Sequence, residues 1–198
     1  MCGHEDKRIL LLFQARVFTY LAGKFCSMNQ TDFPSPDDIA HLPSKAKQKK
    51  AENKKYFEKL KRKKPQLINQ TIAQLHDEVF ARTNCLNCAN CCKTTGPLFT
   101  QKDIERIAKH LNQKPAEFSA QYLRIDEDND YVLQQVPCPF LATDNYCAIY
   151  DVRPKACREY PHTDAGNFNK LFNITLKNTA VCPAVYDIVE LLKQKLPA

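Results

Sequence analysis

Four cysteines lie within eight consecutive residues, in the spacing Cys85-x2-Cys88-x2-Cys91-Cys92. Cysteines separated by two residues can turn their thiolates toward one centre from a single loop or helical turn, a spacing found in zinc knuckles and in iron–sulfur proteins. Because all-sulfur ligation selects soft or borderline ions, the pattern indicates zinc or an iron–sulfur cluster and argues against magnesium, calcium and manganese. Adjacent side chains diverge, so we expect Cys91 and Cys92 to serve different sites or to bridge two of them.

The second half of the chain supplies four more cysteines. Two of these, Cys138 and Cys182, are each followed by proline, as is the last ligand of a bacterial ferredoxin run. Eight cysteines are enough for two sites of four thiolates each. Cys2 and Cys26 lie apart, near the N-terminus, and are left out of the set. The expected metal ligands are Cys85, Cys88, Cys91, Cys92, Cys138, Cys147, Cys157 and Cys182.

A disulfide framework is the main alternative for these cysteines, and it requires an oxidising compartment. The N-terminal stretch 9–25 makes a poor signal peptide, because Glu5 and Asp6 offset the basic start and polar residues interrupt the apolar run. Neither this stretch nor any other reaches the length of an apolar membrane span. We therefore expect a cytoplasmic protein whose thiols stay reduced and available to metal.

Side chains near Cys157 have the chemistry to support a thiolate site. Arginine, tyrosine and histidine can donate hydrogen bonds to thiolates or sulfides and so compensate their negative charge. The alternative is ordinary ion pairing at the surface with nearby acidic residues. The candidates are Arg153, Arg158, Tyr160 and His162.

The composition excludes several common enzyme classes. The 198 residues include only four glycines, which are scattered, so neither a GxGxxG turn nor a GxxxxGK[ST] loop is present. No GxSxG sequence occurs either. No catalytic constellation is visible, and the sequence leaves open whether the protein is an enzyme.

Positive charge is concentrated in one segment, Lys45–Lys64. It holds eleven basic and two acidic residues, a net charge of +9, and since the whole chain carries +7 the remaining residues carry −2. A lysine-rich helix is usually a solvated surface, but it is also the place where contact with nucleic-acid phosphates would arise. Only Tyr56 and Phe57 interrupt the run as stacking residues.

The segments before the cysteines are expected to be an extension and two helices. Residues 1–27 differ from the rest, and either translation starts at Met28 or they form a short amphipathic helix. Residues 29–44 contain three prolines, which suits a mobile connector. A helix capped by Ser44 is expected to end near Pro65, and a second helix over 66–82 carries an apolar stripe. That stripe consists of Ile68, Ile72, Leu75 and Val79.

The cysteine-bearing half combines short helices with a small hairpin. Thr100 and Asp103 form a capping box before a helix, Pro115 starts another, and a last helix follows Pro183. Residues 131–136 indicate a strand and 143–145 the turn of a hairpin. Few apolar residues lie between the cysteine groups, so we expect metal bonds to supply much of the stability.

The expected architecture is α-rich with a small β-hairpin: an irregular, metal-stapled cysteine-cluster domain preceded by a helical arm. The expected divisions are an extension and mobile connector over 1–44, a basic helical arm and the helix leading into the motif over 45–83, and the metal-binding domain over 84–198.

The order of the motifs resembles the YkgJ-type cysteine-cluster family, which is known by its CxxCxxCC motif. The resemblance rests on that cluster, TQKDIERIAKHL, PAEFSAQYL, CPFL, CAIYDVRPKACREYP and a late Cys-Pro pair, over about residues 85–185. It implies that the eight cysteines chelate zinc or iron, and it implies no reaction. Related cysteine patterns accompany flagellin lysine methylation, but this chain lacks a glycine-rich loop for S-adenosylmethionine.

Three functions therefore stay open at this point. The first is binding of zinc or an iron–sulfur centre in a structural or redox role. The second is a zinc-stabilised nucleic-acid or ribosome-associated module that uses the arm Lys45–Lys64. The third is an enzyme that modifies proteins with the cluster as its cofactor.

Overall fold

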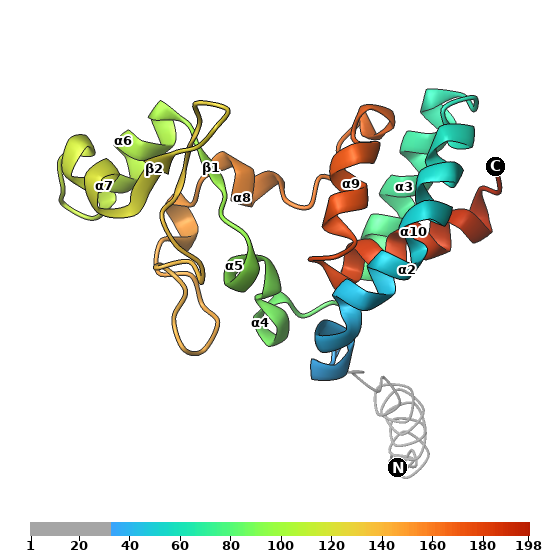
Figure 1. Cartoon of the computed structure of the whole chain (residues 1–198), viewed down its shortest axis with the longest axis horizontal. Coiled ribbons are helices and arrows are strands. Elements are labelled where there is room, and N and C mark those ends of the chain that lie inside the picture. The colour runs from blue at the N-terminus through green and yellow to red at the C-terminus, as the bar shows by residue number, and fades with distance from the viewer. Residues whose placement is uncertain (1–32) are drawn as a thin grey trace, which may run out of the picture. The chain divides into compact units, whose positions relative to one another are not determined.

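The computed structural model describes residues 33–198, which are mostly helical with one small antiparallel sheet (Figure 1). This confirms the predicted α-rich fold with a small β element. The expectations about Met28, Cys2 and Cys26 fall outside the described residues. None of the described helices is both long enough and apolar enough to cross a membrane.

A first core is formed by helices from both ends of the described chain. α2 (Pro36–Leu60), α3 (Pro65–Phe80) and α10 (Pro183–Lys195) pack together, and α9 (Phe172–Asn178) packs on α2 and α10 (Figure 1). Apolar residues three and four apart lie on one side of each helix, which buries them against its neighbours. The predicted apolar stripe of α3 is confirmed, with Ile68, Ile72, Leu75 and Val79 packed against Val185, Ile188, Val189 and Leu192 of α10.

The lysine-rich helix begins earlier than predicted. α2 starts at Pro36 rather than after Ser44, so residues 36–44 are helical and are not an extended connector. Ser35 and Asp38 form a capping box, in which each side chain accepts from the backbone N–H of the other. Pro43 removes one hydrogen bond inside the helix, and this capping offsets that loss.

One face of α2 belongs to the first core. The ring of Phe57 stacks on Phe172 with centroids 4.8 Å apart, and the buried Tyr56 hydroxyl donates to the carbonyls of Leu192 (3.1 Å) and Leu196 (2.9 Å). Tyr56 and Phe57, which the sequence offered as residues for stacking on bases, are therefore committed to the interior. The predicted domain boundaries after residues 44 and 83 stay a prediction.

A second core lies in the cysteine-bearing region. α6 (Gln101–His110) and α7 (Pro115–Tyr122) pack on a sheet of strand order β1–β3–β2. The strands are β1 (Leu98–Phe99), β2 (Leu123–Ile125) and β3 (Tyr131–Leu133), and Tyr131 pairs with both Phe99 and Ile125. The sequence predicted only the strand that begins at 131, because strands of two or three residues are too short to show an alternating pattern.

The second core corrects the expectation that this region has few apolar residues to bury. The predicted capping box of Thr100 and Asp103 and the start at Pro115 are confirmed, and they orient α6 and α7 over the sheet. The buried apolar residues come singly from many short elements, so no long apolar run announces them in the sequence. They are Phe99, Ile104, Ile107, Ala108, Phe118, Leu123, Leu133, Phe140 and Ile149.

The remaining elements are short. They are α4 (Cys85–Cys88), α5 (Asn90–Thr94), η1 (Tyr150–Val152), α8 (Lys155–Glu159) and η2 (Phe168–Lys170). Three of them, α4, α5 and α8, carry five of the eight cysteines. The predicted hairpin around 143–145 is present as a single bridge between Leu141 and Cys147. Its turn is closed where the N–H of Ala142 donates to the carbonyl of Tyr146 (2.8 Å).

Replacing Phe57 with alanine tests whether α2 is part of the core. We expect Phe57→Ala to lower the free energy of unfolding by about 3–5 kcal/mol, because it removes a fully packed ring and leaves a cavity. The control Lys54→Ala, on the exposed side of the same helix, should change stability by no more than about 0.5 kcal/mol. Denaturant unfolding measures both, and equal small effects would contradict this packing.

Candidate metal centre

Two short helical turns carry the CxxCxxCC cluster. α4 bears Cys85 and Cys88, and α5 bears Cys91 and Cys92. Between them Ala89 has a φ of 47°, in the left-handed region that residues other than glycine rarely adopt. This residue ends the first turn and redirects the chain, so that the Cys-x2-Cys pair and the Cys-Cys pair project from two separate turns.

Cys182, although distant in sequence, lies close to the first of these turns. Burial and then negative charge on Cys88 and Cys85 raise the pKa of Cys182 to about 12. The side chain of Asn90 joins the two segments by donating to the carbonyl of Val181 (2.7 Å). The chain thus brings its last cysteine to the Cys-x2-Cys pair.

A second gathering of thiols comes from the loops that follow the sheet. Burial and charges on Cys92, Cys138 and Cys147 raise the pKa of Cys157 to about 12. Burial and charges on Cys92 and Cys147 likewise raise the pKa of Cys138 to about 11. The backbone N–H of Cys138 donates to the carbonyl of Cys92 (2.8 Å), which fixes this loop against α5.

Cys91 and Cys92 stand between the two gatherings, with their Sγ atoms 4.0 Å apart. The hydrogen bond between the two thiols lowers the pKa of Cys92 and raises that of Cys91. After this bond and burial, charges on Cys182 and Cys85 also raise the pKa of Cys91. After burial, charge on Cys92 also raises the pKa of Cys85 and Cys88, so Cys92 acts on both gatherings. We refer below to Cys85, Cys88, Cys91 and Cys182 as the first set and to Cys92, Cys138, Cys147 and Cys157 as the second set.

The donor chemistry fits a soft or borderline metal, although the thiols are not closed around a point. All eight cysteines are free, and burial is the main cause that raises the pKa of six of them, Cys85, Cys88, Cys138, Cys147, Cys157 and Cys182. Within residues 33–198, no three His, Cys, Asp or Glu side chains are already close enough to hold one ion. Buried thiols need a cation to become thiolates, because an unpaired buried charge is costly.

Two cationic side chains act on the thiols. Burial raises the pKa of Cys88, and the charge of Lys93 opposes that shift while its Nζ donates to the Cys88 carbonyl (3.1 Å). Arg153, whose guanidinium lies 3.9 Å from the centroid of the Tyr150 ring, opposes the same rise in the pKa of Cys147. The sequence pointed to Arg153 but not to Lys93, whose only signal is its position directly after the cluster.

The other three candidates near Cys157 have different surroundings. Arg158 Nη1 donates to the carbonyl of Arg153 (2.6 Å), so it braces the backbone. His162 makes no side-chain hydrogen bond within the part of the chain that the structure describes. Tyr160 differs from both, because charges on Cys182, Cys91 and Cys88 act on it after burial and raise its pKa.

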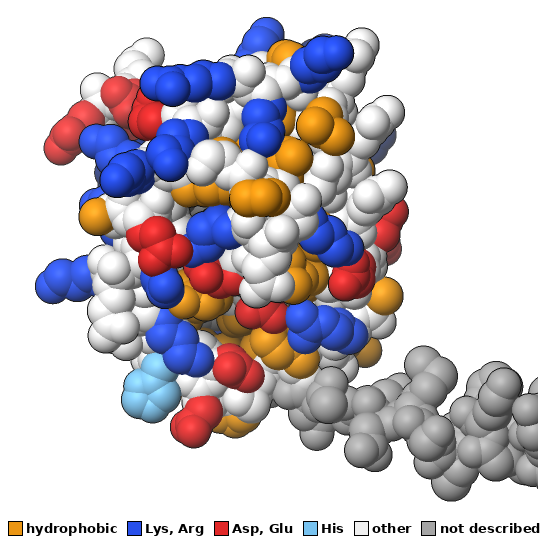
Figure 2. All heavy atoms as spheres, turned by 90° about the vertical axis from the view of Figure 1, so that its right-hand side faces the viewer, with side chains coloured by type: hydrophobic (Ala, Val, Ile, Leu, Met, Phe, Trp, Pro, Cys, Tyr) orange, Lys and Arg blue, Asp and Glu red, His pale blue; other side chains and the backbone are white. Residues whose placement is uncertain are grey.

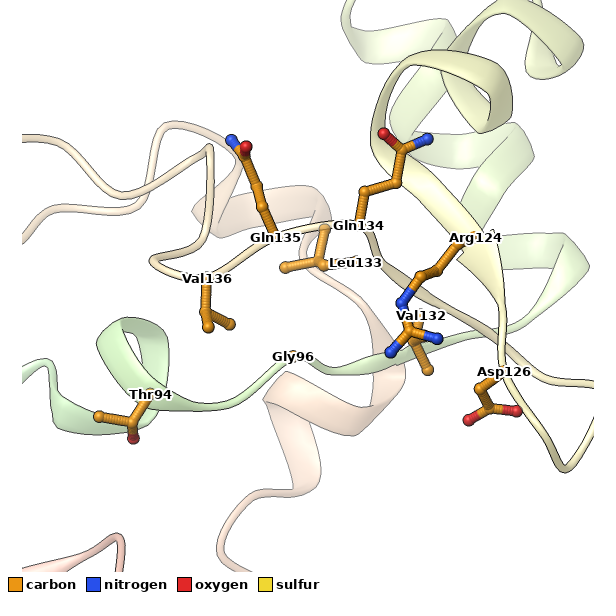
Figure 3. A pocket seen from close by; sticks show the side chains of 9 residues that line it. All are labelled: Thr94, Gly96, Arg124, Asp126, Val132, Leu133, Gln134, Gln135 and Val136. Carbon is orange, nitrogen blue, oxygen red and sulfur yellow. The ribbon is translucent and has the colours of Figure 1, made fainter.

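A shallow hollow of about 310 Å³ lies beside the sheet and is separate from the thiols (Figure 3). Figure 3 shows Arg124 and Asp126 at one end and Val136 near Thr94 at the other. No cysteine lines it. The hollow therefore offers no soft ligand and does not form part of the candidate metal centre.

Residues 84–183 match a family model described as "CxxCxxCC: Putative zinc- or iron-chelating domain". The chain belongs to the CxxCxxCC family. This confirms the resemblance inferred from the sequence. No curated protein and no solved structure matches the chain.

The CxxCxxCC domain coincides with recognisable points of the fold. It runs from Asn84, the N-cap of α4, to Pro183, the first residue of α10, and it contains both thiol sets and the second core. α2, α3 and nearly all of α10 lie outside it. The family therefore accounts for the cysteines and leaves the lysine-rich helix unexplained.

One buried carboxylate positions the segment that carries Cys157. Asp103 accepts from the hydroxyl of Thr100 (2.6 Å), from Arg106 Nη2 (2.6 Å) and from the backbone N–H of Lys155 (3.1 Å), at the start of α8. The sequence identified Asp103 only as a cap of α6. Burial alone would raise the pKa of Asp103, but these hydrogen bonds outweigh it and lower the pKa below its usual value.

Removing the charge of Asp103 should destabilise the CxxCxxCC domain in a pH-dependent way. We expect Asp103→Asn to cost about 1.5–3 kcal/mol near neutral pH, the usual range for hydrogen bonds to a charged group. The lowered pKa contributes stability above about pH 4, the unfolded value, and that contribution is lost as the pH falls through the folded value. Denaturant unfolding of metal-free protein at several pH values measures this.

The stability difference between wild type and Asp103→Asn should therefore shrink below about pH 4. Asp128→Asn is the matched control, because Asp128 is exposed and its carboxylate accepts no hydrogen bond from the described residues. A difference between Asp103→Asn and wild type that stays constant down to strong acid would contradict the assigned role of the carboxylate.

Proposed function

We propose that this chain binds metal through cysteine thiolates at two neighbouring centres, each with four sulfur ligands. The first set would be Cys85, Cys88, Cys91 and Cys182, and the second Cys92, Cys138, Cys147 and Cys157. The observation that carries this proposal is that eight free thiols gather on the two sides of Cys91 and Cys92, whose Sγ atoms lie 4.0 Å apart. Cys88 is buried, Cys85 is exposed and the other six are partly buried. Membership of a family described as zinc- or iron-chelating supports it.

A centre with four thiolates has no open coordination position, which favours a structural or electron-transfer role over hydrolysis at the metal. Zinc would fasten the loops around it, whereas an iron–sulfur cluster would also carry an electron. Because Cys91 and Cys92 are consecutive, two clusters would be close neighbours, an arrangement suited to electron transfer.

Metal binding would draw the thiols of each set together. The segments involved are short turns and loops attached to two packed cores, so they can adjust while the cores stay fixed. Each thiol gives up its proton on binding, and the ion replaces the cation that the buried sulfur otherwise lacks.

Serine substitutions in each set test the assignment. We expect Cys88→Ser and Cys147→Ser each to lose about half of the bound metal, and the double variant to lose nearly all of it, because each set binds independently. Metal analysis of anaerobically purified protein gives the result. Iron with a near-equal amount of acid-labile sulfide identifies a cluster, and colourless protein with zinc identifies the structural site.

Cys26→Ser serves as the matched control, since Cys26 belongs to neither set, and its metal content should equal that of the wild type. Unchanged metal in both single variants would refute the ligand assignment. Loss of all metal in either single variant would show one shared centre instead of two.

A second candidate function is contact between the exposed face of α2 and nucleic-acid phosphates. Lys47, Lys50, Lys54, Lys55 and Arg62 are exposed and form no ion pair within residues 33–198. Lys47 and Lys54 are two turns apart on the side away from the buried face. Figure 2 shows basic side chains spread over the side of the molecule that carries α2, α3 and α10, with acidic ones among them. This supports electrostatic binding without sequence preference.

The salt dependence of binding to a DNA duplex tests this candidate. If those five residues contact phosphates, the slope of log K against log salt should be about −4 to −5. Lys47→Gln/Lys54→Gln should make the slope less steep by about 2, and the control Lys102→Gln/Lys109→Gln on α6 should not. Substitution is preferred to deletion of 45–64, because deletion would remove Tyr56, Phe57 and Leu60 from the core. A slope unaffected by the α2 pair would reject the helix as the contact surface.

A further inference from the structure

Tyr160 carries a buried hydroxyl that has no hydrogen-bond partner among the described residues. The residue follows α8 directly, and its backbone N–H donates to the carbonyl of Ala156 (3.1 Å). Buried hydroxyls in proteins are almost always paired, because an unpaired one has lost its water and gained nothing. The unpaired hydroxyl of Tyr160 therefore indicates an acceptor that is absent from the metal-free chain.

The backbone places Tyr160 beside the segment that carries Cys182 of the first set. The carbonyl of Pro161, the next residue, accepts from Asn178 Nδ2 (3.3 Å), and the carbonyl of Asn178 accepts from the N–H of Cys182 (2.8 Å). Burial, and then negative charges on Cys182, Cys91, Cys88 and Cys92 in that order, raise the pKa of Tyr160. Tyr160 thus follows directly after the turn that carries Cys157 of the second set and lies next to the segment of Cys182 of the first. A neutral phenol is a hydrogen-bond donor.

We propose that the Tyr160 hydroxyl donates a hydrogen bond to a metal-bound thiolate of the first set and so strengthens metal binding at that centre. This inference rests on the proposed function. A neutral thiol is a weak acceptor, whereas a thiolate is a strong one. When a metal displaces the thiol proton to solvent, the Tyr160 O–H gains the acceptor that it lacks in the metal-free chain. Tyr160 is then a positioning residue, and the cysteines alone are the ligands.

Cobalt(II) is a suitable probe, because thiolate-to-cobalt charge transfer gives an absorption band that depends on the electron density of sulfur. Full-length protein carrying Cys138→Ser and Cys147→Ser leaves the first set to report alone. Adding Tyr160→Phe to this parent should lower the cobalt affinity 10- to 100-fold, the usual effect of losing a hydrogen bond to a metal ligand. The stoichiometry should stay the same, and the band should move to longer wavelength.

The metal-free stability separates this role from a structural one. Tyr160→Phe removes an unpaired buried hydroxyl, so the melting temperature of metal-free protein should stay the same or rise. The control Tyr56→Phe removes a hydroxyl that bonds the carbonyls of Leu192 and Leu196, so it should lower the melting temperature and leave cobalt binding unchanged. Tyr160→Phe should therefore weaken cobalt binding without lowering the melting temperature, and Tyr56→Phe should do the reverse.

A second background localises the effect. In protein carrying Cys85→Ser and Cys88→Ser, where only the second set reports, Tyr160→Phe should change neither affinity nor band. If Tyr160→Phe changed neither the cobalt affinity nor the band in the Cys138→Ser/Cys147→Ser protein, the role of Tyr160 would be overturned and the proposed metal binding would stand. Loss of stoichiometric cobalt in Tyr160→Phe would overturn it as well, because Tyr160 would then be a ligand. Absence of a thiolate band in both parents would instead reject the proposed function, and the role of Tyr160 with it.

Discussion

Two consecutive residues, Cys91 and Cys92, impose the constraint on which the rest of the candidate centre depends. Their Sγ atoms lie only 4.0 Å apart, so the divergence expected from the sequence is not observed, and a metal bound by one thiol would lie close to the other. In the proposed arrangement the chain brings sulfur to both sides of α5. On one side it does so with the preceding turn and with Cys182, and on the other with the loops that end at Cys138, Cys147 and Cys157. The left-handed Ala89, the bond from Asn90 to Val181 and the bond from Cys138 to Cys92 are the local means to this arrangement.

Features that depend on neighbours in sequence could be predicted, and features that depend on distant contacts could not. The capping box of Thr100 and Asp103 and the stripe on α3 follow from spacing alone, and both are present. The start of α2 was misplaced because the three prolines of 29–44 favoured a connector and Ser44 a cap, whereas the cap is Ser35 and the helix continues through Pro43. The buried face of α2 was hidden because lysines dominate its composition, while Tyr56 and Phe57 find their partners more than a hundred residues later. The proposed division of the cysteines into two sets depends on the fold, since the spacing in the sequence admits many divisions.

The negative charge of metal-bound thiolates has to be compensated, and the side chains near the proposed centre differ in how they can do this. Four thiolates around a divalent ion leave a net negative charge, which neighbouring donors must compensate in a partly buried site. Lys93 and Arg153 supply positive charge, but each also has another task, at the Cys88 carbonyl and on the Tyr150 ring. The neutral donor of Tyr160 has no other task in the described structure. Because a phenol is neutral, it leaves no unpaired charge in the protein when the metal is absent.

The placement of the thiols between two hydrophobic cores shows where metal would contribute to stability. α2, α3 and α10 are held by one set of apolar contacts, and α6, α7 and the sheet by another. Between them the buried side chains include polar ones, such as Thr163, which bonds His76 (2.8 Å), and Asn178, which donates to the carbonyl of Pro161 (3.3 Å). Thiolate–metal bonds at the proposed centres would add to the contacts that join the cores. On this argument metal release should loosen the turns around Cys88 and Cys147 first, while the amide protons of α3 and α6 remain protected from exchange with solvent.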